Sequence, residues 1–592
     1  LLIAVALVIL VIFLFLRSAS ATFIPALAVP ISLIGTCAMM YLFDFSINNM
    51  TLLALTLSVG FVVDDAIVML ENIMRHIEEG MRPFEAALKG AREVGFTIIS
   101  ITFSLIAVFI PVLLMGGIVG RVFREFAVTV AVAILVSGFV SLTLTPMLCA
   151  RVLRAQNHEK RPNIILRAFE AMFASWLRAY EWALDRVLAY KFVMLGVTLL
   201  TLIGTIYLYV IVPKGFFPQE DTGFLIGVTE AATDTSFEAM SQRQQALAAL
   251  LQADPAVEYI NSTVGAGGPN TTTNYGRFFI SLKPKNERDD VQTVIARLRR
   301  TALQVPGLQA FFQGIQNLNI GGRISKSQYQ YVLQSGDSDA LYRLAPQIRE
   351  KMAQVPGLLD VTTDLYIKNP QLTIEIDREK AAVFGISVGQ IRNELFNAYG
   401  TRQVGTIYMP SNDYKIIMEA KPEFRVDPSD LSKLYVKTAQ GRPIPLDAVA
   451  RMVPSVGPLQ INHQGQQPAV TISFNLARGV SLGYAVDKIT EIEREARLPV
   501  TIVTGFSGTA QVFQDSLRGQ GILILAAIFA AFVILGILYE SFIHPITIIS
   551  GLPSAGIGAI LTLMLFKMEL SVIAMIGIVM LVGIVKKNAI MM

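Results

Sequence analysis

Long apolar stretches, separated by short polar segments, occupy both ends of the chain. Nine of them approach or exceed the roughly 20 apolar residues that an α-helix needs to cross a bilayer. They cover residues 1–16, 22–43, 50–72, 96–115, 126–150, 192–212, 519–539, 545–566 and 571–592. The pattern predicts a multi-span α-helical membrane protein with a long polar region from about 213 to 518.

Composition supports this prediction, because 16% of the 592 residues are charged, against about a quarter in soluble proteins. The net charge of +4 comes from scattered basic residues and does not indicate a nucleic-acid partner. Cys37 and Cys149 both lie within apolar stretches, where we expect buried reduced thiols and not a disulfide.

Both ends of the sequence fall inside apolar stretches. The first stretch begins at Leu1 without the initiator Met, polar lead or small-residue cleavage site of a signal peptide. The last stops at Met592 without flanking polar residues. We therefore expect the chain to be truncated at both ends relative to a longer natural protein.

The short loops between spans fall into two sets whose basic residues can be compared under the positive-inside rule. One set holds Arg121, Arg124 and Lys567. The other holds Arg17, Arg75, Arg82, Lys89, Arg92, Arg151, Arg154, Lys160, Arg161, Arg167, Arg178, Arg186 and Lys191. The richer set should be cytoplasmic, which predicts a multi-pass protein of the bacterial inner membrane with its large polar region in the periplasm.

A further helix is predicted near residues 163–182, where apolar side chains recur at helical spacing. A helix lying along the cytoplasmic interface and a helix packed on the membrane domain both fit this pattern. The stripe consists of Ile165, Phe169, Met172, Phe173, Trp176 and Tyr180.

Residues 17–69 align without a gap on residues 540–592, at a constant offset of 523. The copies would run in the same direction through the membrane, as in transporters whose coupling-ion sites lie between parallel repeats. Matching pairs include Ser18 and Ser541, Pro30 and Pro553, Gly60 and Gly583, and Ala66-Ile67 and Ala589-Ile590. So many coincidences indicate a parallel internal repeat produced by duplication.

The two copies carry opposite charges at equivalent positions. Asp64 aligns with Lys587, and Asp65 aligns with Asn588. An ionised side chain at the centre of a membrane helix costs about 2.5 to 3.5 kcal/mol on insertion scales, so these residues need a common explanation. The simplest one is that the charged residues of the two copies are partners.

Gly60 and Gly583 each lie four residues before the charged residue, on the same helix face. We expect them to let the two helix backbones approach closely.

A buried ion pair that only locks two helices together would need equal charges, and one Lys587 cannot neutralise both Asp64 and Asp65. Two carboxylates near one ammonium in a low dielectric favour proton uptake by one of them, as a proton carrier requires. The carboxylates titrate as a unit, so the proton cannot be assigned to either one. Lys586 adds charge but lies about 100° round the helix from Lys587.

The chain contains no GxxxxGK[ST] motif and no Gly-Lys dipeptide, so the phosphate cradle of an ATP-driven pump is absent. A membrane potential supplies about 2.3 kcal/mol per unit charge per 100 mV. The sequence therefore predicts a transport process driven by a proton or cation gradient, with no cofactor.

The polar region alternates short strands with helices in the order βαββαβ, which predicts a ferredoxin-like α+β subdomain over residues 213–325. The order begins again over residues 326–385 and is completed over residues 466–518, with a strand expected at 371–377. Residues 386–465 would be an insertion in this second subdomain.

The loop at residues 265–274 lacks the GxGxxG order of a nucleotide fold and is expected to be a mobile lip. Phe278 and Phe279, and Phe311 and Phe312, lie on strands near it. Alternation along a strand points one of each pair into the core and leaves the other free to line a cleft.

Three motifs resemble the resistance-nodulation-division (RND) superfamily, in its hydrophobe/amphiphile efflux branch. They are VVDDAIVMLEN at residues 62–72, PKGFFP at 213–218 and KNAI at 587–590. The resemblance covers the whole chain, and the segments VKKN at 585–588 and YESFIHP at 539–545 look most like the MdtB and MdtC type of subunit.

This resemblance implies a trimeric, proton-driven pump that passes drugs and other amphiphilic compounds through an adaptor protein to an outer-membrane channel. Asp64, Asp65 and Lys587 would form its proton relay. Phe279 and Phe311 match phenylalanines of the family's drug pocket, whereas the loop at 265–274 lacks the phenylalanines found there.

The resemblance also assigns the segments of the chain. Residues 1–212 and 519–592 would carry spans two to seven and eight to ten of the family pattern. The two α+β subdomains would be porter subdomains, and residues 386–465 a docking subdomain. The family's first span, N-terminal periplasmic half and last two spans would be missing.

Two other transport functions remain open on the same scaffold. Heavy-metal exporters usually keep one aspartate in the intramembrane motif and gather methionines in the periplasmic cleft, whereas Met240, Met352, Met409, Met418 and Met452 are dispersed here. A lipid carrier or secretion accessory is the other alternative. An enzyme is not indicated, because the four histidines lie far apart in the sequence.

Overall fold

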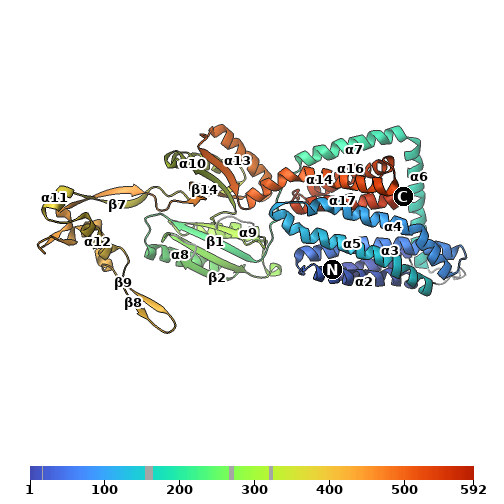
Figure 1. Ribbon diagram of the computed structural model, residues 1–592, viewed down its shortest axis with the longest axis horizontal. Helices are drawn as coiled ribbons and strands as arrows, with labels where there is room; N and C mark the ends of the chain where they lie inside the picture. The colour runs from blue at the N-terminus through green and yellow to red at the C-terminus, as the bar shows by residue number, and fades with distance from the viewer. Residues whose placement is uncertain (17, 154–163, 266–271, 319–324, 592) are drawn as a thin grey trace.

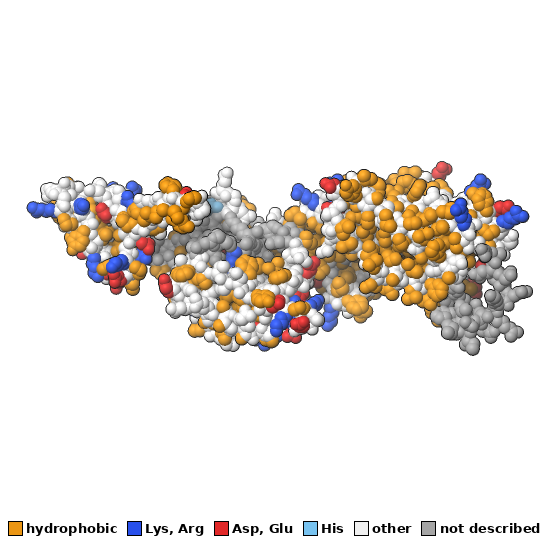
Figure 2. All heavy atoms as spheres, turned by 90° about the horizontal axis from the view of Figure 1, so that it is seen from below, with side chains coloured by type: hydrophobic (Ala, Val, Ile, Leu, Met, Phe, Trp, Pro, Cys, Tyr) orange, Lys and Arg blue, Asp and Glu red, His pale blue; other side chains and the backbone are white. Residues whose placement is uncertain are grey.

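The computed structural model describes residues 1–16, 18–153, 164–265, 272–318 and 325–591. Figure 1 shows a bundle of long helices at one end, two β-sheets in the middle and a slender extension at the other end. Hydrophobic side chains cover much of the bundle in Figure 2, whereas the sheets and the extension show a mixed surface. The apolar and polar parts of the sequence are therefore separated in space.

Every apolar stretch of the sequence is helical in the structure. In the described part of the chain, eight helical segments are long and apolar enough to cross a membrane, and the first helix, of 15 residues, is shorter. The apolar helices are α1 (Leu2–Leu16), α2 (Ala19–Leu42), α3 (Asn49–Glu78), α4 (Pro83–Leu113), α5 (Gly117–Val152), α7 (Lys191–Ile211), α14 (Thr509–Tyr539), α15 (Ile543–Ile549) with α16 (Leu552–Leu565), and α17 (Val572–Met591).

Helix α5 packs against α2, α3 and α4, and α4 in turn packs against α14 and α17. Helix α7 packs against α16 and has no buried residue of its own. Its side chains Phe192, Leu200 and Ile203 are exposed although they are strongly apolar, as expected for a surface that faces lipid. The bundle is thus a multi-pass membrane domain.

In the two aligned copies, helices end and begin at equivalent positions. Helices α2 and α16 end, and helices α3 and α17 begin, at positions that differ by 523. Between them, Asp44 and Lys567 occupy the same place and both adopt the left-handed conformation, with φ of 58° and 53°. In both turns the next backbone N–H donates to the carbonyl four residues before the turn residue, at 2.9 and 2.8 Å. The copies therefore share a turn as well as sequence.

The copies differ in one respect. Helix α2 runs unbroken through Pro25 and Pro30, whereas its counterpart is divided into α15 and α16 just before Pro553. Proline removes a backbone donor and crowds the preceding turn, so a break at this position has a local cause.

Helix α6 (Ile164–Ala189) connects α5 to α7 at the end of the bundle far from the sheets (Figure 1). Met172, Trp176 and Tyr180, three members of the predicted apolar stripe, are exposed. The apolar stripe is therefore largely exposed at these three positions, which favours the interfacial position. Side chains 161–171 and 173, and with them the rest of the stripe, lie outside the described residues.

Both cysteines are free thiols, but only Cys149 is buried. The expectation of burial is wrong for Cys37, because its face of α2 lies on the outside of the bundle. An apolar stretch does not distinguish a face turned to protein from a face turned to lipid.

The first α+β unit consists of β1 (Phe224–Ala231), α8 (Phe237–Gln252), β2 (Val257–Val264), β3 (Tyr275–Leu282), α9 (Val291–Ala302) and β4 (Leu308–Gly314). Its strands lie in the order β2-β3-β1-β4, and all neighbours are antiparallel. Ser236 and Asp290 cap the two helices by accepting hydrogen bonds from backbone N–H groups. Residues of both helices and of all four strands share one apolar core.

The second unit consists of β5 (Tyr329–Ser335), α10 (Ser338–Ala353), β6 (Leu358–Thr363), β14 (Gln467–Leu476), α13 (Leu482–Ala496) and β15 (Ile502–Ser507). Strand β14 pairs with β5 and β6, strand β15 pairs with β5, and the short β13 (His463–Gln464) pairs with β14. The arrangement β6-β14-β5-β15 repeats the strand order of the first unit.

The inserted segment forms the slender extension of Figure 1. The strand expected at 371–377 in the second unit is β7 (Asn369–Ile376), which pairs instead with β12 (Ala450–Gly457). The structure therefore places this strand in the insertion, because β14 already holds the position beside β6. The other elements are α11 (Arg378–Val383), α12 (Val388–Tyr399), the hairpin β8 (Arg402–Tyr408) and β9 (Asp413–Met418), and the pair β10 (Tyr435–Lys437) and β11 (Pro443–Pro445).

A polar cluster joins the two units. The Lys326 ammonium, just before β5, lies 2.6 Å from Glu230 on β1 and donates to the Tyr366 hydroxyl at 2.5 Å. Tyr366 also bonds to Glu230 and to Tyr275 on β3. Burial lowers the pKa of Lys326, and the neighbouring Glu230 opposes that shift. We call these four residues the inter-sheet cluster.

The inter-sheet cluster predicts an unequal effect of single and double substitutions. Glu230→Gln should lower the unfolding temperature, because breaking a buried ion pair from one side costs about 3 to 5 kcal/mol. Adding Lys326→Met should recover most of the loss. Thermal unfolding of the purified protein measures both, with Lys351→Met in the exposed Lys351–Glu495 pair as a control that should change little. A double variant as unstable as Glu230→Gln would contradict the pairing.

Candidate functional site

Opposite charges from the two sequence copies meet inside the bundle. Lys587 on α17 lies with its Nζ 2.9 Å from Asp65 Oδ1 and 3.6 Å from Asp64 Oδ2, both on α3. The alignment of the copies therefore predicted which charged residues lie together. We call Asp64, Asp65 and Lys587 the charge cluster.

The two carboxylates of the charge cluster have different surroundings. Asp65 and Lys587 are buried, whereas 49% of the Asp64 side chain is exposed. Successive residues of a helix point about 100° apart, so the two carboxylates lie in different directions from the axis of α3. Lys587 thus has one enclosed partner and one partner at the edge of the packed region.

Backbone and hydroxyl groups complete the surroundings of the pair. Lys587 Nζ donates to the Phe61 carbonyl at 3.2 Å, and Ser137 on α5 donates to Asp65 Oδ2 at 3.5 Å and to the Val62 carbonyl at 3.3 Å. The sequence reasoning missed Ser137, because α5 lies outside the aligned segments 17–69 and 540–592. A hydroxyl among the apolar residues of α5 was the available signal, and it is shared by several other residues of that helix.

Lys586 is completely buried beside the charge cluster, but it faces another helix. Its ammonium donates to the Ser104 carbonyl on α4. This direction agrees with the angle of about 100° that separates consecutive residues of a helix. Lys586 therefore holds α17 to α4, while Lys587 reaches α3.

The expected close approach of α3 and α17 at their glycines is wrong. A Cβ at Gly60 would meet no atom within 4 Å, and a Cβ at Gly583 would meet Leu105 of α4 at 3.0 Å. Helix α17 packs along α4, so the small residue at Gly583 serves that contact. The long side chain of Lys587, and not a backbone contact, spans the distance to α3.

The aromatic residues of the first sheet divide between its two faces. Register through β1 puts Phe279 opposite Ile226 and Phe311 opposite Val228, so both share one face, while Phe278 and Phe312 lie in the core with α8 and α9. Phe279 is 46% exposed, whereas Phe311 is buried under the Lys326 ammonium, 5.9 Å from its ring centroid.

A polar cavity of about 290 Å³ lies between the two units. Its lining includes Phe312 but neither Phe279 nor Phe311. The polar residues around it are Gln219, Gln292, Thr293, Arg299, Gln313, Gln316, Gln328, Asn475 and Arg478. Of the predicted lip at 265–274, residues 266–271 lie outside the described part of the chain.

Comparison with known protein families gives an independent result. The model of the family described as AcrB/AcrD/AcrF matches residues 1–592. The match spans the helices of the bundle, both α+β units and the insertion, so it covers the charge cluster and the inter-sheet cluster together.

The charge cluster predicts different stabilities for two neighbouring substitutions. Asp65→Asn should lower the unfolding temperature more than Asp64→Asn, because it leaves the buried Lys587 ammonium with only the more distant carboxylate. Adding Lys587→Met to Asp65→Asn should recover part of the loss. Thermal unfolding in detergent measures the difference, and equal effects of the two asparagine variants would contradict the inequality of the two contacts.

Proposed function

Because the chain belongs to the AcrB/AcrD/AcrF family of RND-type efflux transporters, we propose that it works in proton-driven export of drugs and other amphiphilic compounds across the bacterial cell envelope. The observation that carries this proposal is the charge cluster, in which one buried ammonium lies between two carboxylates of unequal exposure. The family is one of transporters and not of enzymes.

Proton uptake by the carboxylate pair changes the position of lowest energy for Lys587. When the two carboxylates hold one proton between them, the ammonium has a single counter-charge. Asp65 and Asp64 offer Lys587 two contacts that differ in direction, at 2.9 and 3.6 Å. Protonation and deprotonation thereby favour different arrangements of α17 against α3, which is the two-state element that coupling requires.

The partly exposed Asp64 supports a route for protons to the pair. Water or another polar group can reach its carboxylate, whereas Asp65 and Lys587 are enclosed. A membrane potential of 100 mV supplies about 2.3 kcal/mol for each charge that crosses it, enough to change an equilibrium more than tenfold.

A continuous helix supports a mechanical connection from the charge cluster to the sheets. Helix α14 begins directly after β15 and runs without interruption into the membrane domain. It packs against α4, and α4 is held to α17 through Lys586. A shift of α17 is thereby passed through two packed helices to the second α+β unit.

The remaining assignments follow from the family and stay part of the proposal. Members generally work as trimers with adaptor and outer-membrane partners, and we assign the same partners to this chain, with its β-rich part in the periplasm. The two ferredoxin-like units would be porter subdomains of an MdtB/MdtC-type subunit, and the insertion a docking subdomain. Phe279, the exposed member of its pair, would contact substrate.

The test uses a pump-deficient bacterium that expresses the natural full-length protein with its adaptor. Wild type should raise resistance to drugs and bile salts, and Asp65→Asn, expressed equally well, should reduce resistance to that of the empty strain. Asp44→Asn is the matched control, because this aspartate lies in a turn where Asn tolerates the positive φ.

Purified protein in liposomes gives a second readout for the same variants. Addition of substrate should cause proton release from liposomes that contain wild type or the Asp44→Asn control. It should cause no proton release from liposomes that contain Asp65→Asn. Undiminished resistance and proton release in the Asp65→Asn variant would remove the charge cluster from the mechanism. A wild type without any drug or bile-salt phenotype would favour lipid, secretion or metal transport.

A further inference from the structure

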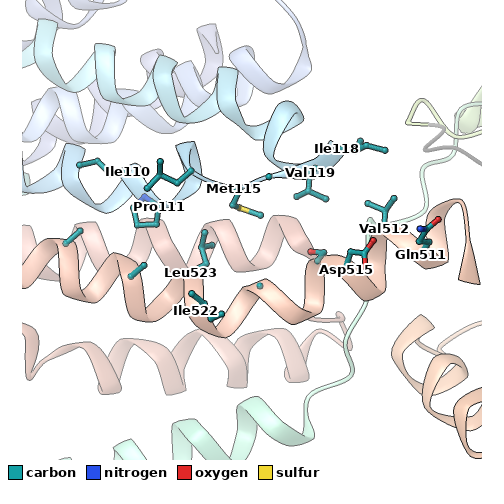
Figure 3. A pocket seen from close by; sticks show the side chains of 17 residues that line it. Ile110, Pro111, Met115, Ile118, Val119, Gln511, Val512, Asp515, Ile522 and Leu523 are labelled. Carbon is teal, nitrogen blue, oxygen red and sulfur yellow. The ribbon is translucent and has the colours of Figure 1, made fainter. Parts of the chain in front are cut away.

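A cavity in the membrane domain lies away from the charge cluster. It has a volume of about 870 Å³ and opens between the end of α4, the turn into α5 and the part of α14 from Gln511 to Ala530 (Figure 3). The lining residues on α14 recur on one helix face from Gln511 to Ala530. This volume lies within the range of pockets that hold drug-sized ligands.

The cavity is polar at one end and apolar at the other. Figure 3 shows Gln511 and Asp515 at one end, and Ile110, Pro111 and Leu523 towards the other. Among the described residues that line it, Asp515 is the one charged residue. Its carboxylate is exposed, so a charged group can approach it from water.

The polar end of the cavity lies outside the membrane span, and its apolar end lies within the span. The apolar, span-forming part of α14 is Gly521–Tyr539, and Gln511 and Asp515 come before it, on the side that continues into β15. Leu523 and the residues after it lie within the span. An amphiphilic molecule in a membrane is oriented in the same way, with its polar group at the surface and its apolar body inside.

Small residues keep the cavity open. A Cβ at Gly116 or Gly519 would meet no atom within 4 Å, although both residues line the cavity. Glycine in a helix costs about 1 kcal/mol relative to alanine, so Gly519 is unfavourable for α14 itself. The buried hydroxyl of Ser516, another lining residue, has no hydrogen-bond partner among the described residues.

We propose that this cavity binds an amphiphilic organic cation, with the cationic group beside Asp515 and the apolar body along the α4–α14 walls. The proposal rests on the efflux function above and deepens it, by naming the substrate class that enters from the membrane at this position. The negative charge at the mouth favours cations over anionic amphiphiles, and the lining of Ile110, Leu114, Ile522 and Leu523 takes the apolar body.

Two neighbouring glycines provide a matched pair of variants. Gly519→Leu places a side chain in the cavity, whereas Gly521→Leu adds the same atoms to the same helix at a position that does not line it and also meets no atom within 4 Å. Both substitutions raise helix propensity, so neither is expected to unfold α14.

Binding is measured by fluorescence polarisation of rhodamine 6G, an amphiphilic cation, on the purified full-length protein. Gly519→Leu should raise the Kd about tenfold, or remove one class of site, whereas Gly521→Leu should leave it unchanged. Asp515→Asn should weaken rhodamine 6G binding and leave deoxycholate, an anionic amphiphile, unaffected. Glu540→Gln at the far end of α14 is the matched charge control.

Resistance of cells to hexadecyltrimethylammonium, compared with deoxycholate, should follow the same order of variants. Equal binding and resistance in Gly519→Leu and Gly521→Leu would overturn the inference. Loss of co-purified phospholipid from Gly519→Leu, with rhodamine 6G binding unchanged, would overturn it by making the cavity a lipid site.

The Asp65→Asn variant separates this inference from the proposed function. It should abolish resistance to both compounds and keep rhodamine 6G binding. Binding that depends on Gly519 and Asp515 in a protein whose wild type confers no resistance would support the cavity and remove the efflux function. Resistance that requires Asp65 but is unchanged in the Gly519→Leu and Asp515→Asn variants would support the efflux function and overturn the inference about the cavity.

Discussion

A buried ion pair constrains this membrane domain more than any other contact. The Lys587 ammonium and the Asp65 carboxylate are both removed from water, and each is the nearest counter-charge of the other. The Phe61 carbonyl and the Ser137 hydroxyl compensate part of the desolvation. Because Asp64 offers a second contact nearby, Lys587 is constrained to the interior but has more than one carboxylate partner there.

Much of the fold could be predicted from the local periodicity of apolar and polar residues. Apolar runs predicted every long helix, and the alternation of short strands with helices predicted the elements of both α+β units to within a few residues, apart from the placing of β7. Strand β7 was assigned to the wrong sheet, because alternation reports that a strand exists and not which partner it has. The exposure of Cys37 was missed for a similar reason, since lipid and protein surroundings select the same apolar residues.

Only the part of the candidate site that lies within the aligned segments could be predicted from the sequence. The constant offset between the copies predicted that Asp64 and Lys587 are partners, and their side chains are in contact in the structure. Ser137 and the direction of Lys586 towards α4 were not accessible, because α4 and α5 lie outside the aligned segments. The contact at Gly583 was predicted with the wrong helix. A glycine indicates that another element packs closely but does not identify that element, which here is α4.

The shared turn at Asp44 and Lys567 bears on how these charges arose. In an ancestor built from two identical halves, any charged residue at the position of Asp64 would have faced its own copy, and like charges in a low dielectric repel. The backbone of the turn and the helix ends could be the same in both halves, whereas the charges could not. The shared backbone therefore accepts either sign of charge at this position, and the contact between Asp64 and Lys587 exists because the two copies differ there.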